Sequence, residues 1–115
     1  MKIGSVSEQT GLSIHTIRYY EKQALIRPAP KDESGHRAYS KKDVEVLNWL
    51  VCMKNSGMPL SKIKAYTHAF YAKDAPACVE QLETHLRHLI DQQQKIAHYI
   101  EVTEQKIHRL KKRLT

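Results

Sequence analysis

The fold of this chain is decided by one stretch, Leu12-Ser13-Ile14-His15-Thr16-Ile17-Arg18-Tyr19-Tyr20-Glu21-Lys22-Gln23-Ala24-Leu25. Ile14, Ile17 and Leu25 have the spacing of the inward stripe of a short helix. The outward positions carry side chains that can donate hydrogen bonds to phosphates and base edges, namely His15, Thr16, Arg18, Tyr19 and Lys22. We therefore predict a helix with one buried face and one face suited to DNA.

A first short helix is predicted just before this stretch. Ser5-Val6-Ser7-Glu8 matches the capping-box pattern that starts a helix. Thr10-Gly11-Leu12 supplies a tight turn, and Ser13 is placed to cap the next helix. Two short helices joined in this way form a helix-turn-helix, whose second helix enters the major groove of DNA. The same caps also occur in helix pairs that serve only as packing elements.

The segment after Ile26 has a different character. Pro28 and Pro30 exclude a helix and confine any strand to an edge, and Ser34-Gly35 marks a chain reversal. The pattern predicts a small β-ribbon, called the wing below. Arg37 and Tyr39 lie two residues apart, so on an extended strand they share a face and can grip the DNA backbone. The alternative is a solvated hairpin with Tyr39 packed on the core.

Two further helices are predicted between the wing and residue 72. Ser40-Lys41-Lys42-Asp43 caps a third helix that ends near Asn55-Ser56-Gly57. Pro59 is tolerated in a helical first turn and starts a fourth helix. We interpret this second helix pair as scaffold.

A coiled-coil pattern follows from Val79 onward. The seam alternates spacings of three and four without a slip through Val79, Leu82, Leu86, Leu89, Gln93, Ile96, Ile100, Thr103, Ile107, Leu110 and Leu114. Such a long register predicts a coiled coil, and a helix of about 57 Å, at ~1.5 Å per residue, needs a partner. Gln93 and Thr103 place polar groups in the seam, which helps to fix register or strand number. The pattern alone leaves the direction of pairing open.

Charge is unevenly distributed along the 115 residues. The formal net charge of +7 favours a polyanionic partner. Residues 1–72 carry eleven basic and six acidic side chains, residues 73–104 three and six, and residues 105–115 five and none. This distribution favours a DNA-facing module and a separate pairing segment. No targeting or membrane-spanning segment is visible, and two cysteines are too few for a disulfide framework, so we expect a cytoplasmic protein.

The motifs together resemble the MerR family of transcription regulators over essentially the whole chain. The resemblance is carried by Ile3-Gly4, Thr10-Gly11-Leu12-Ser13, Thr16-Ile17-Arg18-Tyr19-Tyr20-Glu21, Gly35-His36-Arg37-Ala38-Tyr39, Asp43-Val44, Asn55-Ser56-Gly57-Met58 and the long terminal helix. It implies a mainly α fold, with a winged helix-turn-helix DNA-binding domain at residues 1–72 and a coiled-coil dimerisation helix at residues 77–114.

The resemblance also implies a way of acting on DNA. Family members form homodimers through an antiparallel coiled coil and bind a pseudo-palindromic promoter with an over-long spacer. They bend and untwist that spacer so that RNA polymerase can use both promoter elements. Carried over by position, Thr16, Arg18 and Tyr19 fall in the recognition helix and Arg37 and Tyr39 in the wing.

Signal sensing is the least defined part of the resemblance. Metal-sensing members keep cysteines in a loop after the dimerisation helix, and drug-sensing members add a large domain; the sequence through Thr115 shows neither, and we expect no metal and no cofactor. The pair His85 and His88 has no third ligand nearby. Cys52 resembles the helix cysteine of members that respond to aldehydes and other electrophiles, as in a stress response, or it is a small core residue. Cys78, beside a helix start, is placed for a lowered pKa.

Other functional classes fit the sequence less well. An architectural, excisionase-like DNA-binding protein without an inducer would explain the DNA-binding domain at residues 1–72, called the head below. It gives no role to the long heptad repeat. A coiled-coil adaptor explains the helix but not Arg18 and Arg37. We do not expect an enzyme, because the sequence has no nucleophile and base pair, no glycine-rich phosphate loop and no ligand cluster.

Overall fold

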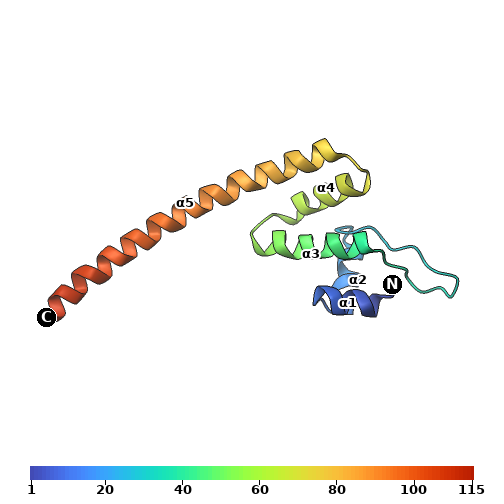
Figure 1. The fold of residues 1–115 in the computed structure, drawn as a ribbon, viewed down its shortest axis with the longest axis horizontal. Helices are drawn as coiled ribbons and strands as arrows, with labels where there is room; N and C mark the ends of the chain where they lie inside the picture. Colours follow the sequence, from blue (N-terminus) through green and yellow to red (C-terminus); the bar gives the residue numbers. More distant parts are fainter. The chain divides into compact units, whose positions relative to one another are not determined.

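The computed structural model describes residues 1–115 as a mainly α protein with five helices and no named strand, which confirms the expected fold class (Figure 1). Its packing separates two units, residues 1–81 and residues 82–115. The last helix belongs to both and is uninterrupted. The helices are α1 (Ile3–Thr10), α2 (Ile14–Lys22), α3 (Lys41–Asn55), α4 (Leu60–Tyr71) and α5 (Ala75–Leu114).

The helix-turn-helix is formed by α1 and α2. Gly11 ends α1 in the left-handed region at a φ of 73°, where its N–H donates to the carbonyl of Ser7. Ser13 caps α2 as predicted, because its hydroxyl accepts from the N–H of Thr16 at 3.1 Å. The predicted start of α1 at Ser5 is wrong. The helix begins earlier, at Ile3, and Met1 and Tyr39 exchange two backbone hydrogen bonds just before it, of 2.5 and 2.7 Å.

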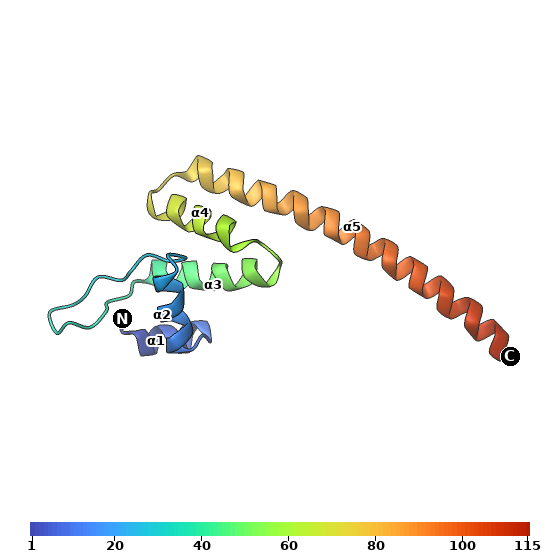
Figure 2. The same ribbon diagram turned by 180° about the vertical axis from the view of Figure 1, so that it is seen from behind.

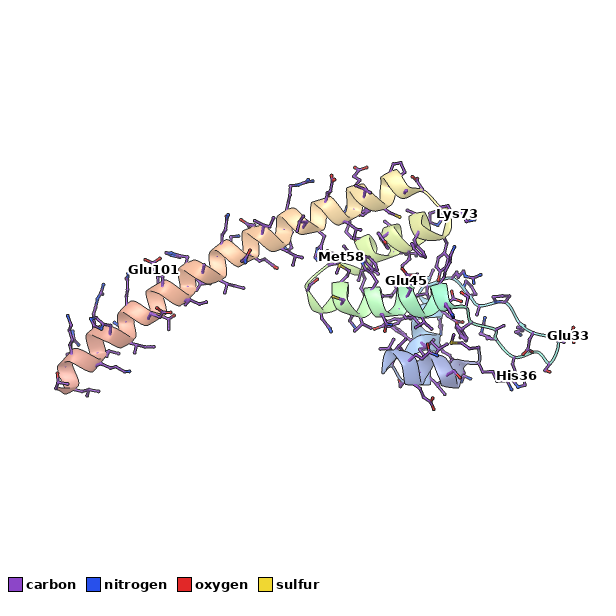
Figure 3. All side chains as sticks on the ribbon, in the orientation of Figure 1. Glu33, His36, Glu45, Met58, Lys73 and Glu101 are labelled. Atoms are coloured by element: carbon purple, nitrogen blue, oxygen red, sulfur yellow. The ribbon has the colours of Figure 1, made fainter.

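The wing is a hairpin held by a single antiparallel bridge between Lys31 and Arg37, with Glu33 and His36 near its tip (Figure 3). Gly35 turns the chain at a φ of 79°. The carboxylate of Asp32 accepts from the N–H groups of Ser34 and His36 at 2.9 and 3.0 Å. The predicted ribbon is therefore reduced to one bridge. Pro28 and Pro30 have no N–H donors with which to extend a ladder.

The core of the first unit is built around α3, which lies between α1 and α2 on one side and α4 on the other in both views (Figures 1 and 2). Ser40 and Asp43 form the predicted capping box at its start. Trp49 of α3 stacks on Tyr66 of α4, with ring centroids 3.9 Å apart. Buried aliphatic and aromatic side chains from all these segments fill the centre, including Val6, Ile17, Tyr20, Leu25, Ile26, Tyr39, Val46, Leu47, Leu50, Met58 and Ile63.

The long helix α5 starts two residues before the predicted Ala77, where the Asp74 carboxylate accepts from the N–H of Ala77 at 3.2 Å. The packing division falls after Gln81, within α5, and the division into domains at residues 1–72 and 77–114 stays a prediction. None of the five helices combines the length and apolar character needed to cross a membrane.

Candidate nucleic-acid interface

The outward face of α2 carries the side chains expected to contact DNA. Arg18 is exposed and Tyr19 has 48% of its surface open to solvent, whereas Ile17 beside them is fully buried. Thr16 is half-buried, and its hydroxyl lies 2.8 Å from that of Ser13 at the helix start. Ile14 was predicted to face inward, but it is 38% exposed because it occupies the first position of the helix. The helix thus presents a cation and a phenol on one open surface.

The wing side chains are arranged differently from the prediction. Tyr39 is only 3% exposed, and its hydroxyl donates to the Glu21 carboxylate of α2. Burial, together with the hydrogen bond from its hydroxyl to the negatively charged Glu21, raises the pKa of Tyr39 above its usual range. The expectation that its phenol faces the DNA backbone is therefore corrected. The alternative of a Tyr39 packed on the core describes the structure.

Arg37 is partly open, with 40% of its side chain exposed. Its Nε lies 3.2 Å from the second oxygen of Glu21, and its Nη1 donates to the carbonyl of Ala29 at 3.1 Å. Glu21 therefore accepts from both predicted wing residues at once. This Glu21 cluster, made of Glu21, Arg37 and Tyr39, fixes the wing against α2.

Sequence reasoning missed Glu21. The available clue is its position four residues after Ile17, which puts a carboxylate on the inward face of α2. A charge at such a position needs a buried partner, because an unpaired carboxylate in a core is costly. Its partners lie 16 and 18 residues further along the chain, so no local pattern identifies them.

A second buried carboxylate, Asp43, joins three segments of the head. Arg27 binds it through two contacts of 3.1 and 3.3 Å, and the Tyr71 hydroxyl donates to it at 2.7 Å. The N–H of Ser40 donates at 2.9 Å. Burial acts to raise the pKa of Asp43, but the hydrogen bonds from Ser40, Tyr71 and Arg27 and the charge of Arg27 outweigh it, so the net pKa is lowered. This Asp43 hub, made of Asp43, Arg27, Ser40 and Tyr71, connects the segment just before the wing and the start of α3 to the end of α4.

The two cysteines occupy contrasting sites. Cys52 is exposed near the end of α3, so the alternative of a small buried core residue is wrong. The neighbouring Lys54 is directed to α2, where its Nζ donates to the Tyr20 hydroxyl at 3.5 Å. Cys78 is half-buried, and its burial and the nearby Asp74 carboxylate raise its pKa, which is opposite to the expected direction.

Comparison with known proteins places these features in a family. The sequence profile of the MerR HTH family regulatory proteins matches residues 1–69. The HTH-type transcriptional regulator AdhR of Bacillus subtilis is 36% identical over 74 residues, covering 64% of this chain and 53% of that protein. The Heavy metal-dependent transcription regulator 2 of Rhizobium meliloti is 33% identical over 103 residues, covering 90% and 69%. The chain spans about half the length of the first curated relatives it matches.

A solved structure gives the same assignment. It is described as HiNmlR, a MerR family regulator lacking the sensor domain, bound to promoter DNA, and it matches with a TM-score of 0.77 at 27% identity over 92% of this chain and 86% of that one. The family profile covers more than half of the sequence, and its match includes the capped helix-turn-helix and the wing. The resemblance inferred from the motifs is confirmed, and the chain belongs to the MerR family of helix-turn-helix transcriptional regulators.

Proposed function

We propose that the chain acts as a homodimer that binds a pseudo-palindromic promoter, and that it bends and untwists the spacer so that RNA polymerase can use the promoter. In each half-site α2 enters the major groove and the wing lies on the adjacent backbone. The protein works on DNA in the cytoplasm. No chemical step is part of this role, which is one of binding and deformation of DNA.

The observation that carries the proposal is the open apolar seam of α5. Leu86, Ile96 and Ile100 are each more than half exposed, and further aliphatic side chains continue the same stripe. Contiguous exposed apolar surface on this scale marks an interaction site, and an unbroken heptad selects another helix as its partner. A dimer formed in this way carries two recognition helices, which matches two half-sites related by a two-fold axis.

In this proposal Arg18 and Tyr19 contact bases or phosphates, and Thr16 contributes beside them at the start of α2. The exposure of Arg18 and Tyr19 supports these roles. Arg37 is open enough to reach phosphate while it stays paired with Glu21. Tyr39 positions the wing rather than contacting DNA.

The charges along α5 favour an antiparallel dimer. Residues 105–115 carry five basic side chains and no acidic one, so a parallel pair would place two such segments side by side. An antiparallel pair places each of them beside the partner's residues 79–91, where Glu80, Glu83 and Asp91 outnumber Arg87. Opposite charges then face each other along the flanks, which favours the antiparallel arrangement.

Cys52 remains the candidate for a thiol that receives an electrophile or redox signal. Its exposure makes it reachable by an electrophile, and α3, which carries it, also carries the Asp43 hub at its other end. An adduct on α3 is therefore placed to bias the orientation of the head.

To test this role, transcription from the cognate promoter is measured for Cys52→Ser and for the matched control Cys78→Ser, each with and without an aldehyde. Loss of the response in Cys52→Ser alone supports the role, and an unchanged response contradicts it.

The proposed function is tested by a footprint on the region upstream of the protein's own gene, combined with run-off transcription. We expect the protein to protect a pseudo-palindrome from cleavage, with increased cleavage at its centre. We also expect the amount of transcript from the promoter to change when the protein is added. The variant Ile96→Asp/Ile100→Asp, which disrupts the seam, should leave no footprint at the same concentration. A footprint without any effect on transcription would instead identify an architectural DNA-binding protein.

A further inference from the structure

We propose that the two copies of α5 pair in one specific antiparallel register, in which Gln93 of each chain faces the partner's Thr103. This inference rests on the proposed homodimer and goes beyond it, because it specifies which residues meet. In the chain itself the seam from Leu82 to Leu114 is largely open to solvent, and it is therefore available for such pairing.

The geometry of antiparallel helices restricts the possible registers. The two helices run in opposite directions. The residue numbers of two seam residues that face each other therefore add up to the same value in every layer of one register. The seam alternates heptad positions a and d, and in an antiparallel pair each a position faces a d position of the partner. The registers that keep the seam closed therefore differ by whole heptads, and only a few of them give substantial overlap.

Only one of these registers matches polar residues with polar residues. It pairs Gln93 with the partner's Thr103, and every other layer is then apolar on both sides. These apolar layers join Leu82 with Leu114, Leu86 with Leu110, Leu89 with Ile107 and Ile96 with Ile100 of the partner.

The neighbouring registers bury the same two polar groups against aliphatic side chains. Sliding the helices by one heptad in one direction places Gln93 against the partner's Ile96 and Thr103 against its Leu86. Sliding in the other direction places Gln93 against the partner's Leu110 and Thr103 against its Ile100. An amide buried against an aliphatic group loses its hydrogen bonds, so both alternatives are disfavoured.

The charges beside the seam select the same register independently. Glu83 and Lys111 each directly follow a seam residue, Leu82 and Leu110, and such flanking positions pair two residues out of step with the seam layers. In this register Glu83 therefore lies beside the partner's Lys111, and the two-fold axis repeats the pair, which gives two flanking ion pairs. In one shifted register Glu83 faces the partner's Glu104, and in the other Lys111 faces the partner's Ile90. The polar layer and the flanking charges lie at different places on α5, yet both favour one alignment.

Site-directed cross-linking tests the register. In a Cys52→Ser/Cys78→Ser background, one tagged chain carries Leu89→Cys and a second carries Ile107→Cys, and the co-expressed pair is oxidised with glutathione disulfide. These positions face each other in the proposed register, so we expect most of the mixed dimer to be covalently linked. A shift by one heptad would separate them by about 10 Å along the axis, which prevents the disulfide.

The single variants serve as controls for direction. In the proposed dimer, position 107 of one chain lies about 27 Å from position 107 of the other, at ~1.5 Å per residue, so Ile107→Cys alone should stay unlinked. Efficient linking of Ile107→Cys alone would show a parallel dimer and overturn the inference. A dimer in sedimentation that links in neither experiment would also overturn it, while leaving the homodimer of the proposed function intact. A monomer in sedimentation would instead contradict the proposed function itself.

Charge reversal provides a second test that does not depend on cysteines. We expect Glu83→Lys and Lys111→Glu each to weaken the dimer about tenfold at low salt, and the double variant to return within about twofold of the wild type. Glu101, labelled on α5 in Figure 3, occupies an outer heptad position, so Glu101→Lys is the matched control and should change the dimer constant by less than about twofold. If the double variant loses as much dimer affinity as the two single variants combined, Glu83 and Lys111 do not face each other and the register is wrong.

Discussion

Removing the Asp43 carboxylate is expected to destabilise the head severely. Asp43 is 2% exposed and accepts from Ser40, Arg27 and Tyr71. Loss of the capping-box acceptor costs about 1 kcal/mol, and loss of the charge-assisted bonds costs roughly 1.5–3 kcal/mol. Arg27 is 39% exposed and regains water, which limits the penalty of leaving it unpaired. We predict a loss of about 3–4 kcal/mol for Asp43→Ala and a loss of about 1 kcal/mol for the matched control Tyr71→Phe.

Urea unfolding monitored by tryptophan fluorescence measures these values. Trp49 is the only tryptophan and stacks on Tyr66, so its emission reports the packing of α3 on α4. All variants are compared at one protein concentration, because dimerisation contributes to the free energy of unfolding. A loss of less than about 1 kcal/mol for Asp43→Ala would refute the energetic role of the Asp43 hub.

The same hub gives a pH dependence with a definite sign. The pKa of Asp43 is lower in the folded protein than in the unfolded chain, so its contribution is fully present above the unfolded pKa, which lies near 4. The contribution is lost as the pH falls through the folded pKa. We therefore expect the stability difference between wild type and Asp43→Asn to shrink below about pH 4. A difference that stays constant down to pH 2 would show that folding does not lower the pKa of Asp43.

Further predictions concern the DNA-binding face and the thiols. Fluorescence anisotropy should show that Arg18→Ala weakens binding to the operator by about 1–3 kcal/mol and binding to random DNA by less; an equal loss would make Arg18 a phosphate contact. Arg37→Ala should weaken both and flatten the dependence on salt by about one unit of slope; an unchanged slope would remove Arg37 from the interface. Mass spectrometry after brief iodoacetamide treatment at neutral pH should show Cys52 labelled before Cys78, whose pKa is raised and whose side chain is half-buried; faster labelling of Cys78 would contradict this order.

Local sequence patterns predicted the elements well. The cap of α2 at Ser13, the capping box of Ser40 and Asp43, and the turn at Gly11 all form as expected. These features depend on residues only a few positions apart, where backbone geometry determines what can bond. The long α5 was predictable for the same reason, since a heptad is a local repeat.

The contacts that position the site were not predictable from local patterns. Alternation on a strand indicated that Arg37 and Tyr39 share a direction, and both do bind Glu21, but alternation does not tell whether that direction is toward DNA or toward the core. The Tyr71 hydroxyl reaches Asp43 across 28 residues of sequence. Such pairings follow from the packing of whole helices. A single sequence shows them only as unexplained charges at inward positions.

The most direct test of the proposed dimeric regulator is the stoichiometry of its operator complex, measured by analytical ultracentrifugation. We predict a free dimer at micromolar concentration and two chains on each pseudo-palindromic operator. We also predict that the seam variant Ile96→Asp/Ile100→Asp sediments as a monomer that no longer holds the full site. A wild-type chain that stays monomeric at this concentration, or an operator that binds a single chain with full affinity, would contradict the proposed mechanism.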